Sequence, residues 1–397
     1  MMLLDGAEFS FSPTAIDPSG ARHGLLQTPH GTIATPAFLF CGTRGAIKGL
    51  TAEQVRQCGT QVILANTYHL SLQPGAETVA QLGGLHRMMD WSGPMLTDSG
   101  GFQIFSLGHG GVAREIKGCR GRPTARTLIK ITEDGAWFRS YRGGGIHLLS
   151  PESSIQIQRL LGADLVLPLD ECTPFHADRT YTADATRRSH RWELRSLEEF
   201  RRSTGKQAIY GIVQGGIYED LRRESCAFVG EHAFFGQAIG GSLGGNREQM
   251  REIVAMVCGQ KHPTKPTHLL GIGGLGDIMH GIGCGVDTFD CVHPTRLARH
   301  GGAIVPPSLS DGTGHWNLKN ARFAKDPNPI DASCPCHACR TASRGYIHHL
   351  FRAGETLGGQ LLAIHNITFI NRFFAAAREA ILAGRWREFC RINGENI

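Results

Sequence analysis

Short apolar runs recur along the chain with longer amphipathic segments between them, a pattern typical of alternating strands and helices. The runs contain many β-branched and aromatic residues and are bounded by glycine, proline or aspartate. Eight of them are predicted to be strands, at residues 33–40, 62–65, 95–97, 164–169, 208–213, 237–240, 268–271 and 288–291. Eight alternating units favour a closed (β/α)₈ TIM barrel, an α/β fold, over an open parallel sheet.

Two helix starts are readable between these strands. Thr51 is followed three residues later by Gln54, which predicts a capping box. Ser150 followed by Pro151 predicts an N-cap with proline at the first helical position. The chain has 397 residues, whereas a barrel needs about 250, so an accessory region is also expected.

Polar residues and glycines stand at the carboxyl ends of most predicted strands. In barrel enzymes these ends meet on one face and build the active site. A single such residue is more often a hydrogen-bonded loop residue than a catalytic one. Convergence of many favours a polar ligand site, formed by Asn66, Asp98, Asp170, Gln214, Gly240, Gly241, Gly271 and Asp290.

Three cysteines fall within six residues at 334–339, in the order Cys-Pro-Cys-His-Ala-Cys. Thiolates at this spacing are typical of a tetrahedral zinc site. Spacing does not choose the fourth ligand among His337, His348, His349 and His365. Because four protein ligands leave no place for water, we expect a structural metal. We expect it to hold a subdomain of roughly residues 326–366, and we divide the chain into a barrel at 1–325 and a zinc-binding region with C-terminal helices at 326–397.

Basic residues are concentrated in three stretches, although the net charge is only +6. The first contains Arg114, Lys117, Arg120, Arg122, Arg126 and Lys130, and the second spans Arg187 to Arg202. A solvated helix face explains the second better than nucleic-acid binding, because glutamates intervene. For the third stretch, Arg296 and Arg299, nucleic-acid binding is the better explanation, because these residues lie close to Asp290 in the sequence. Scattered cysteines, no signal-peptide pattern and no long apolar run lead us to expect a soluble, intracellular protein without membrane contact.

Several longer motifs resemble one family. They are Asn-Thr-Tyr-His-Leu at 66–70, Thr-Asp-Ser-Gly-Gly-Phe-Gln at 97–103, Asp-Glu-Cys-Thr-Pro at 170–174, Gly-Ile-Val-Gln-Gly-Gly at 211–216, Phe-Asp-Cys-Val-His-Pro-Thr-Arg at 289–296, and the cysteine cluster. Together they resemble the tRNA-guanine transglycosylases of bacterial type, over residues 22–371. The resemblance implies a zinc-bearing barrel, usually a homodimer in the cytoplasm. It would replace guanine at the anticodon wobble position of tRNA with a free 7-deazaguanine base.

The resemblance also implies roles for individual residues. Asp290 matches the nucleophile and Asp98 the general acid and base. The groups that bind the base match Asp170, Gln214, Gly241, Ser242, Gly244 and Asn66, with Phe102 and Leu270 sandwiching the ring. Cys334, Cys336, Cys339 and His365 match the zinc ligands. Arg296 and Arg299 are suited to tRNA phosphates near the anticodon.

The chemistry of glycosidic cleavage agrees with these roles. A carboxylate that captures C1′ of the ribose divides one hard displacement into two easier steps. A second carboxylate can protonate the departing guanine and later deprotonate the incoming base. Asp170 can accept the two adjacent N–H donors of guanine, and the Gln214 amide or the Gly241 N–H can serve O6.

One loop departs from the bacterial pattern. Residues 240–246 read Gly-Gly-Ser-Leu-Gly-Gly-Asn, where the family usually shows Gly-Gly-Leu-Ala-Val-Gly-Glu. Gly244 would remove a branched side chain from the pocket wall, and Asn246 a carboxylate that supports the loop. Eukaryotic relatives, which take the bulkier queuine, also carry glycine there. Neutral drift is the alternative, but we expect queuine to be preferred over 7-aminomethyl-7-deazaguanine.

Three other functions compete with this one. A catalytically silent, tRNA-binding partner subunit of the same family could lose its carboxylates, but Asp98, Asp170 and Asp290 are all present. An archaeal type would carry further RNA-binding domains after the zinc region. A barrel glycosidase with structural zinc would explain the paired carboxylates but not the base-reading set.

Overall fold

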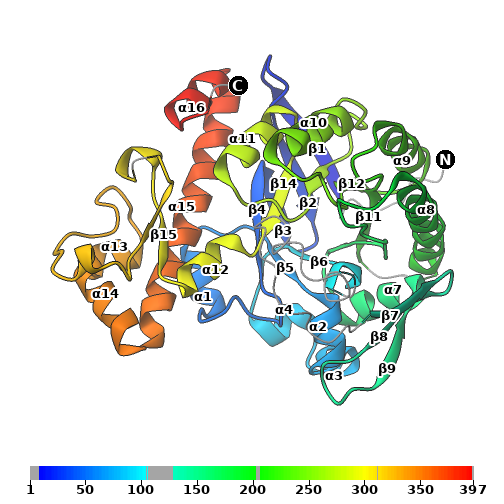
Figure 1. The fold of residues 1–397 in the computed structure, drawn as a ribbon, viewed down its shortest axis with the longest axis horizontal. Helices are drawn as coiled ribbons and strands as arrows, with labels where there is room; N and C mark the ends of the chain where they lie inside the picture. Colours follow the sequence, from blue (N-terminus) through cyan, green and yellow to red (C-terminus); the bar gives the residue numbers. More distant parts are fainter. Residues whose placement is uncertain (1–8, 104, 106–127, 203–205, 311, 396–397) are drawn as a thin grey trace.

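Eight parallel strands close into a barrel at the centre of the computed structural model, which describes residues 9–103, 105, 128–202, 206–310 and 312–395 (Figure 1). The strands follow one another around the barrel in chain order, and β14 closes it by pairing with β4. They are β4 (Ala37–Cys41), β5 (Ile63–Ala65), β6 (Met95–Thr97), β10 (Leu165–Val166), β11 (Ala208–Val213), β12 (Gly236–Ile239), β13 (Thr267–Leu269) and β14 (Thr288–Cys291). The predicted (β/α)₈ barrel is confirmed.

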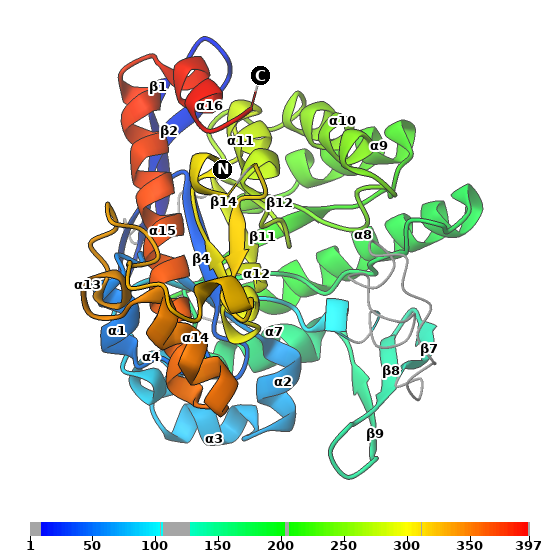
Figure 2. The ribbon, with the colours of Figure 1, turned by 60° about the vertical axis from the view of Figure 1, so that its left-hand side comes forward.

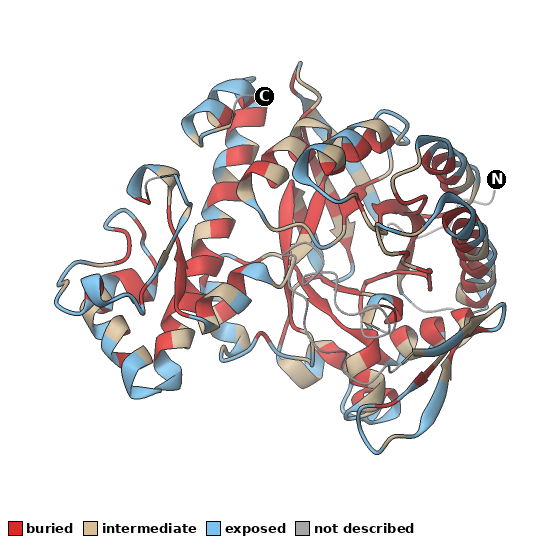
Figure 3. Ribbon diagram, in the orientation of Figure 1, coloured by how far each residue is buried: buried red, intermediate tan, exposed pale blue. Residues whose placement is uncertain are grey.

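Side chains of the barrel strands alternate between two apolar clusters. Leu39, Leu64 and Ile212 belong to the cluster that fills the barrel, whereas Phe38 and Ile63 belong to the larger cluster that also includes the surrounding helices. Because both faces are covered, the barrel strands are largely buried, as Figure 3 shows, and only the end of β14 is partly exposed.

The first predicted strand, at residues 33–40, is in fact two strands. β3 (Gly31–Thr35) pairs antiparallel with β2 (Arg22–Thr28), which pairs with β1 (Ser10–Ile16). Pro36 separates β3 from β4, and a residue without an N–H cannot continue a hydrogen-bonded ladder. Leu26 and Ile33 of this small sheet join the cluster inside the barrel, so the sheet closes its amino-terminal end.

Helices connect the strands around the outside of the barrel. Thr51 and Gln54 form the predicted capping box of α1, and Ser150 caps α7 with Pro151 in its first turn. Both predicted helix starts are therefore confirmed. The helices are α1 (Ala52–Gln57), α2 (Thr67–Leu72), α3 (Ala76–Gln81), α4 (Gly84–Met89), α7 (Pro151–Leu161), α8 (Arg179–Arg201), α9 (Glu219–Glu231), α10 (Arg247–Cys258), α11 (Leu275–Gly283) and α12 (His293–Arg299).

A three-stranded antiparallel sheet that was not predicted lies between β6 and α7. It consists of β7 (Leu128–Thr132), β8 (Gly135–Arg139) and β9 (Ile146–Leu149). Figure 2 shows it extending from the barrel below α8. The buried Trp192 of α8 anchors it, since its indole N–H donates to the Glu133 carbonyl at 2.9 Å.

The C-terminal region is organised by one long helix. α15 (Thr356–Leu382) runs beside the barrel and carries the smaller elements on its other side (Figure 1). These elements are β15 (Gly302–Ile304), β16 (His315–Asn317), two short 3₁₀ turns (Pro307–Leu309 and Ala321–Phe323), α13 (His337–Thr341) and α14 (Arg344–Ala353). The last helix, α16 (Trp386–Ile392), follows α15 and approaches the turn after β1, since the Trp386 N–H donates to Asp17. The buried Asn366 of α15 accepts a hydrogen bond from the Ile304 N–H at 2.8 Å, so β15, which precedes residue 326, also packs here. The division of the chain at residue 326 stays a prediction. Among the described residues, every helix is too short or too polar to cross a bilayer.

Candidate active site and metal centre

Two carboxylates stand at the carboxyl ends of different barrel strands. Asp98 follows β6, and its side chain accepts hydrogen bonds from Asn66 Nδ2 at 2.5 Å and from the Thr67 N–H at 3.0 Å. Burial raises the pKa of Asp98 to about 7, and the charge of Asp290 acts in the same direction. Near neutral pH Asp98 can therefore either hold or accept a proton, as a general acid and base must.

The carboxylate of Asp290, on β14, is held on one side. Its Oδ1 accepts the Gly271 N–H at 2.9 Å and lies 3.3 Å from His268 Nε2. Its Oδ2 has only the thiol of Cys41, at 3.8 Å, among the described residues. A thiol is a weak donor, so Oδ2 keeps its lone pairs for another partner. This anchoring holds Oδ1 in place and leaves Oδ2 with only a weak donor among the described residues.

Sequence reasoning missed His268, which is fully buried. Its Nδ1 lies 2.9 Å from Thr288 Oγ1, which fixes the ring beneath Asp290. A signal was available in the sequence, because His268 stands two residues before Leu270 and side chains two apart on a strand share a face.

Asp170 and Gln214 form a polar wall beside these carboxylates. Gln214 Nε2 donates to Asp170 Oδ2, and both side chains are buried. Burial raises the pKa of Asp170 to about 6, although Gln214 and Ser99 donate to it. Gly241 completes the wall: its φ is +74°, and a Cβ there would lie 2.3 Å from Gln214 Oε1. Only glycine fits this position.

A buried arginine that sequence reasoning missed holds this wall together. Arg222, on α9, is fully buried and donates to the carbonyls of Val213 at 2.8 Å and Gly240 at 2.9 Å. It also donates to the carbonyls of Gly216 and Ser242, at 2.9 and 3.1 Å. It thereby joins the loops after β11 and β12. Nothing in a Glu-Asp-Leu-Arg-Arg helix start distinguishes it from its exposed neighbour.

The predicted base-contacting residues divide into two groups. Both ends of the Asn66 side-chain amide are hydrogen-bonded, because Nδ2 donates to Asp98 and Oδ1 accepts the His69 N–H at 2.8 Å. The Asn66 side chain therefore orients Asp98. Phe102, in contrast, is 47% exposed, and Leu270 is partly buried beside Gly240. Their apolar surfaces are free to contact a ring, although their pairing stays a prediction.

The loop that departs from the bacterial pattern has its own support. Gln249 Oε1 accepts the Gly245 N–H at 3.1 Å, and Asn246 caps α10. Gly244 has a φ of +110°, and a Cβ there would point at Gln249 Oε1, 2.4 Å away. The missing Cβ at this position therefore makes room for Gln249, and the effect of Gly244 on the base pocket stays a prediction.

Cations gather at the mouth of the barrel. Arg296 is exposed on α12, and Arg299 donates to the Thr295 carbonyl. Burial lowers the pKa of Lys48, and the charges of Arg299, Arg44 and Arg296 lower it further. The four cations therefore share one field, and within the described part of the chain no carboxylate forms an ion pair with any of them.

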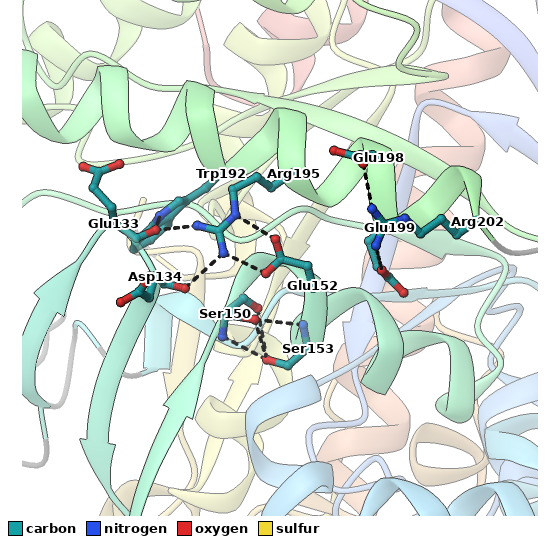
Figure 4. Close-up of polar contacts among 10 residues, drawn as sticks. All are labelled: Glu133, Asp134, Ser150, Glu152, Ser153, Trp192, Arg195, Glu198, Glu199 and Arg202. Atoms are coloured by element: carbon teal, nitrogen blue, oxygen red, sulfur yellow. Dashed lines mark hydrogen bonds and ion pairs between the residues drawn. The ribbon is translucent and has the colours of Figure 1, made fainter.

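Most arginines of the basic stretch of α8 are paired with carboxylates. Arg195 donates to both oxygens of Glu152, at 2.7 and 2.8 Å, and to carbonyls of the β7–β8 turn (Figure 4). Arg188 and Arg191 pair with Glu133, Arg187 with Glu224, and Arg202 with Glu198 and Glu199. The predicted solvated, paired helix face is what the structure shows. Of the first basic stretch, Arg114 to Arg126 lie outside the described residues, and Lys130 stacks on Trp137.

The cysteine cluster forms a buried site with His365. The ligand atoms of Cys334, Cys336, Cys339 and His365 all lie within 4.8 Å of one another. His365 comes from α15, and its Nε2 lies 2.8 Å from the Ile304 carbonyl, which leaves Nδ1 facing the thiols. A ligating histidine whose second nitrogen is held by a carbonyl is the usual arrangement at a metal. The donor set could therefore hold a metal ion.

A second group of possible ligands lies at the amino-terminal end of the barrel. His30 Nδ1 and His86 Nε2 lie 2.6 and 3.4 Å from opposite oxygens of Asp164. The two imidazole rings are stacked, with centroids 3.6 Å apart and an interplanar angle of 12°. A metal lies in the plane of each ligating ring, so nearly parallel stacked rings do not converge on one ion.

Known proteins match the chain along almost its whole length. The family model described as queuine tRNA-ribosyltransferase matches residues 17–393. A queuine tRNA-ribosyltransferase of Roseiflexus sp. is 48% identical over 95% of this chain and 97% of its own. That of Thermosynechococcus vestitus is 48% identical over 93% and 91%, and that of Chlamydia trachomatis 43% over 92% and 96%.

Fold and comparisons together define a barrel enzyme of the tRNA-ribosyltransferase class. The chain belongs to the queuine tRNA-ribosyltransferase family, whose members are tRNA-guanine transglycosylases. The family expected from the sequence motifs is confirmed.

Proposed function

We propose that the enzyme replaces guanine at the anticodon wobble position of tRNA with a 7-deazaguanine, through a covalent bond between Asp290 and C1′ of the ribose. The observation that carries this proposal is the pair of carboxylates at the barrel mouth. Asp290 has one oxygen anchored by the Gly271 N–H and one that meets only the weak donor Cys41 among the described residues, and burial raises the pKa of Asp98 to about 7. Two carboxylates with such different environments suit a nucleophile and an acid–base group.

Each carboxylate acts twice. Asp290 Oδ2 attacks C1′ while the bond from C1′ to guanine N9 breaks, and protonated Asp98 gives its proton to the departing guanine. The incoming base then loses its N9 proton to ionised Asp98, and N9 attacks C1′. The ester bond to Asp290 breaks, and the carboxylate is restored. The proton on Asp98 at the end replaces the one it gave at the start.

The wall of Asp170, Gln214 and Gly241 selects a guanine-like edge. Asp170 accepts from the ring N–H and the amino group, and the N–H of Gly241 or the amide of Gln214 donates to O6. Phe102 and Leu270 cover the two faces of the ring. Arg222 positions this wall, because it fixes the carbonyls on either side of Gly241.

Queuine is the favoured base and 7-aminomethyl-7-deazaguanine the second. The loop from Gly241 to Gly245 has only Ser242 and the buried Leu243 as side chains, which leaves space beside the base. The test is competition between the two bases for incorporation into tRNA. Gly244→Val should reduce queuine use relative to the amine, because it displaces Gln249 toward the loop.

Gly354→Val is the matched control for Gly244→Val. Gly354, at the end of α14, also has a positive φ, +77°, and a Cβ there would meet nothing within 4 Å among the described residues. Equal use of both bases by the parent enzyme, or the same ratio in the two variants, would contradict the preference.

The substrate and partners follow from the same site. The tRNA anticodon stem-loop binds with phosphates near Arg296 and Arg299, and the free base enters beside Asp170. We place the enzyme in the cytoplasm as a homodimer, the usual state of the family it resembles.

Zinc is the metal that best suits the C-terminal cluster, since three thiolates and one imidazole nitrogen are a common structural zinc set. Cys334, Cys336, Cys339 and His365 would hold one ion per chain and join α13 to α15. Metal analysis should give one zinc, which Cys339→Ser removes. Cys284→Ser, at a cysteine outside the cluster, should retain it.

The proposed reaction is tested by trapping the intermediate. Enzyme and tRNA mixed without the second base should give a covalent complex on a denaturing gel, absent in Asp290→Asn and present in the surface control Asp184→Asn. A stable complex without any base exchange would favour a silent partner subunit. Hydrolysis of nucleosides or sugars without tRNA would favour a glycosidase.

A further inference from the structure

The turn after β8 presents an aromatic ring at the mouth of the barrel. Tyr141 is 41% exposed, yet its hydroxyl lies 3.3 Å from both Arg44 Nη2 and His69 Nδ1. The guanidinium carbon of Arg44 lies 5.7 Å from the ring centroid, and the ring of Tyr68 lies 6.1 Å away. The ring is therefore held in place by side chains from two other elements while much of it stays open to solvent.

The side chains that hold this ring come from the two segments that also contact Asp98 and Asp290. Asn66 and Thr67, at the start of α2, bind Asp98, and His69 follows within one helical turn, about 5 Å. Arg44 lies in the loop after β4, three residues beyond Cys41, whose thiol contacts Asp290. Tyr141 is thus held by residues from the loop after β4 and from α2 after β5, at the same end of the barrel as the two carboxylates.

The charge around the ring is positive. Besides burial, the charges of Arg44, Arg296 and Arg299 all act on Lys48 and lower its pKa. Among the described residues, no carboxylate forms an ion pair with Arg44. Burial lowers the pKa of His69 to about 4, helped by Arg44 and Lys48. His69 is therefore neutral at physiological pH and supports Tyr141 without adding repulsion.

We propose that Arg44 and Tyr141 form a subsite for a nucleotide that flanks the exchanged one in the anticodon loop. Its base stacks on the open face of Tyr141, and Arg44 contacts its phosphate. Proteins that bind single-stranded nucleic acid combine a stacking ring with a nearby cation in this way. The proposal rests on the tRNA-ribosyltransferase function and adds a binding step that precedes the chemistry.

Fluorescence of 2-aminopurine tests the stacking. The base is placed on either side of the wobble position in an anticodon stem-loop, and binding to the parent enzyme should quench one of the two. Tyr141→Phe should keep the quenching, because the ring remains. Tyr141→Ala should lose it and raise KM for the stem-loop by roughly 5- to 100-fold, with kcat at saturating RNA within about twofold of the parent value.

Tyr346→Ala is the matched control, since Tyr346 is a similarly exposed tyrosine (46%) on α14, away from the barrel mouth. Unchanged quenching and KM in Tyr141→Ala would overturn the subsite. A changed sedimentation coefficient with unchanged RNA binding would also overturn it, by showing that the ring contacts another copy of the chain. Absence of base exchange in the parent enzyme is a separate readout and would instead count against the proposed function.

Discussion

The barrel mouth and the flank formed by α8 are both rich in charged residues, but they use them in opposite ways. On the flank, Arg191 and Arg188 lower the pKa of Glu133 to about 2. At the mouth, burial raises the pKa of Asp98 to about 7, and Arg44, Lys48 and Arg296 form no ion pair within the described residues. Paired charges stabilise a fold, whereas charges without partners are available to a substrate.

The largest expected effect is on kcat, which should fall when a carboxylate at the barrel mouth is replaced but not when one on the flank is replaced. Asp290→Asn and Asp98→Asn should each lower kcat for base exchange at least about 1,000-fold, because each removes a group that forms or breaks a bond. Glu133→Gln on the flank should change kcat less than about twofold. Comparable losses in all three variants would show that the contrast between mouth and flank is wrong.

The second effect concerns the cations. Arg296→Glu should weaken binding of the anticodon stem-loop about 10- to 100-fold at 0.1 M salt, because it reverses a charge that faces phosphates. Arg187→Glu exchanges an arginine that is already paired with Glu224, so it should leave RNA affinity nearly unchanged. Fluorescence anisotropy with labelled stem-loop measures both. An equal loss in the two variants would assign the flank to RNA binding.

The third effect is a pH dependence at the mouth. Formation of the covalent complex needs protonated Asp98, so its single-turnover rate should fall about tenfold per pH unit above pH 7. The second half-reaction needs ionised Asp98 and should instead slow below pH 7. Rapid-quench measurements of each half-reaction, from pH 5.5 to 9, separate the two limbs. A flat profile for complex formation would remove Asp98 as the acid.

The smallest effect concerns stability of the flank. Arg195→Met should lower the free energy of unfolding by about 1–3 kcal/mol, because it breaks the two bonds to Glu152 and the bond to the Asp134 carbonyl, whereas the Glu133 carbonyl keeps the Trp192 indole as a donor. Urea denaturation followed by circular dichroism measures the change. Arg296→Met at the mouth should cost less than about 0.5 kcal/mol. A larger cost at Arg296 would indicate an internal partner there.

Much of the fold could be predicted because strand spacing and capping are local properties. Buried strands are recognisable from short apolar runs, and the residue after each run reaches the same face of the barrel. This is why Asp98, Asp170 and Asp290 were predicted to converge. The error at residues 33–40 has a local cause too, since Pro36 interrupts that apolar run and proline cannot continue a ladder of paired strands.

The C-terminal region shows the limit of local patterns. Three cysteines at close spacing predict a metal site, but spacing left four histidines open as the last ligand. The family resemblance pointed to His365, and the structure brings that residue against the cluster from α15. The sequence of strands β7 to β9 has no clear alternation of apolar and polar residues, so these strands were not predicted.

The sequence by itself determined the number of barrel strands, the carboxylates at their ends and the presence of a thiol cluster, because these depend on residues close together in the chain. Only the tertiary structure decided which charges are neutralised. The pairing of α8 arginines with Glu133 and Glu152, the role of Arg222 beneath Gly241, and the meeting of Arg44 with Tyr141 all join residues from separate elements. An ionic or hydrogen-bonded contact depends on distances of about 3 Å, and these distances are set by packing.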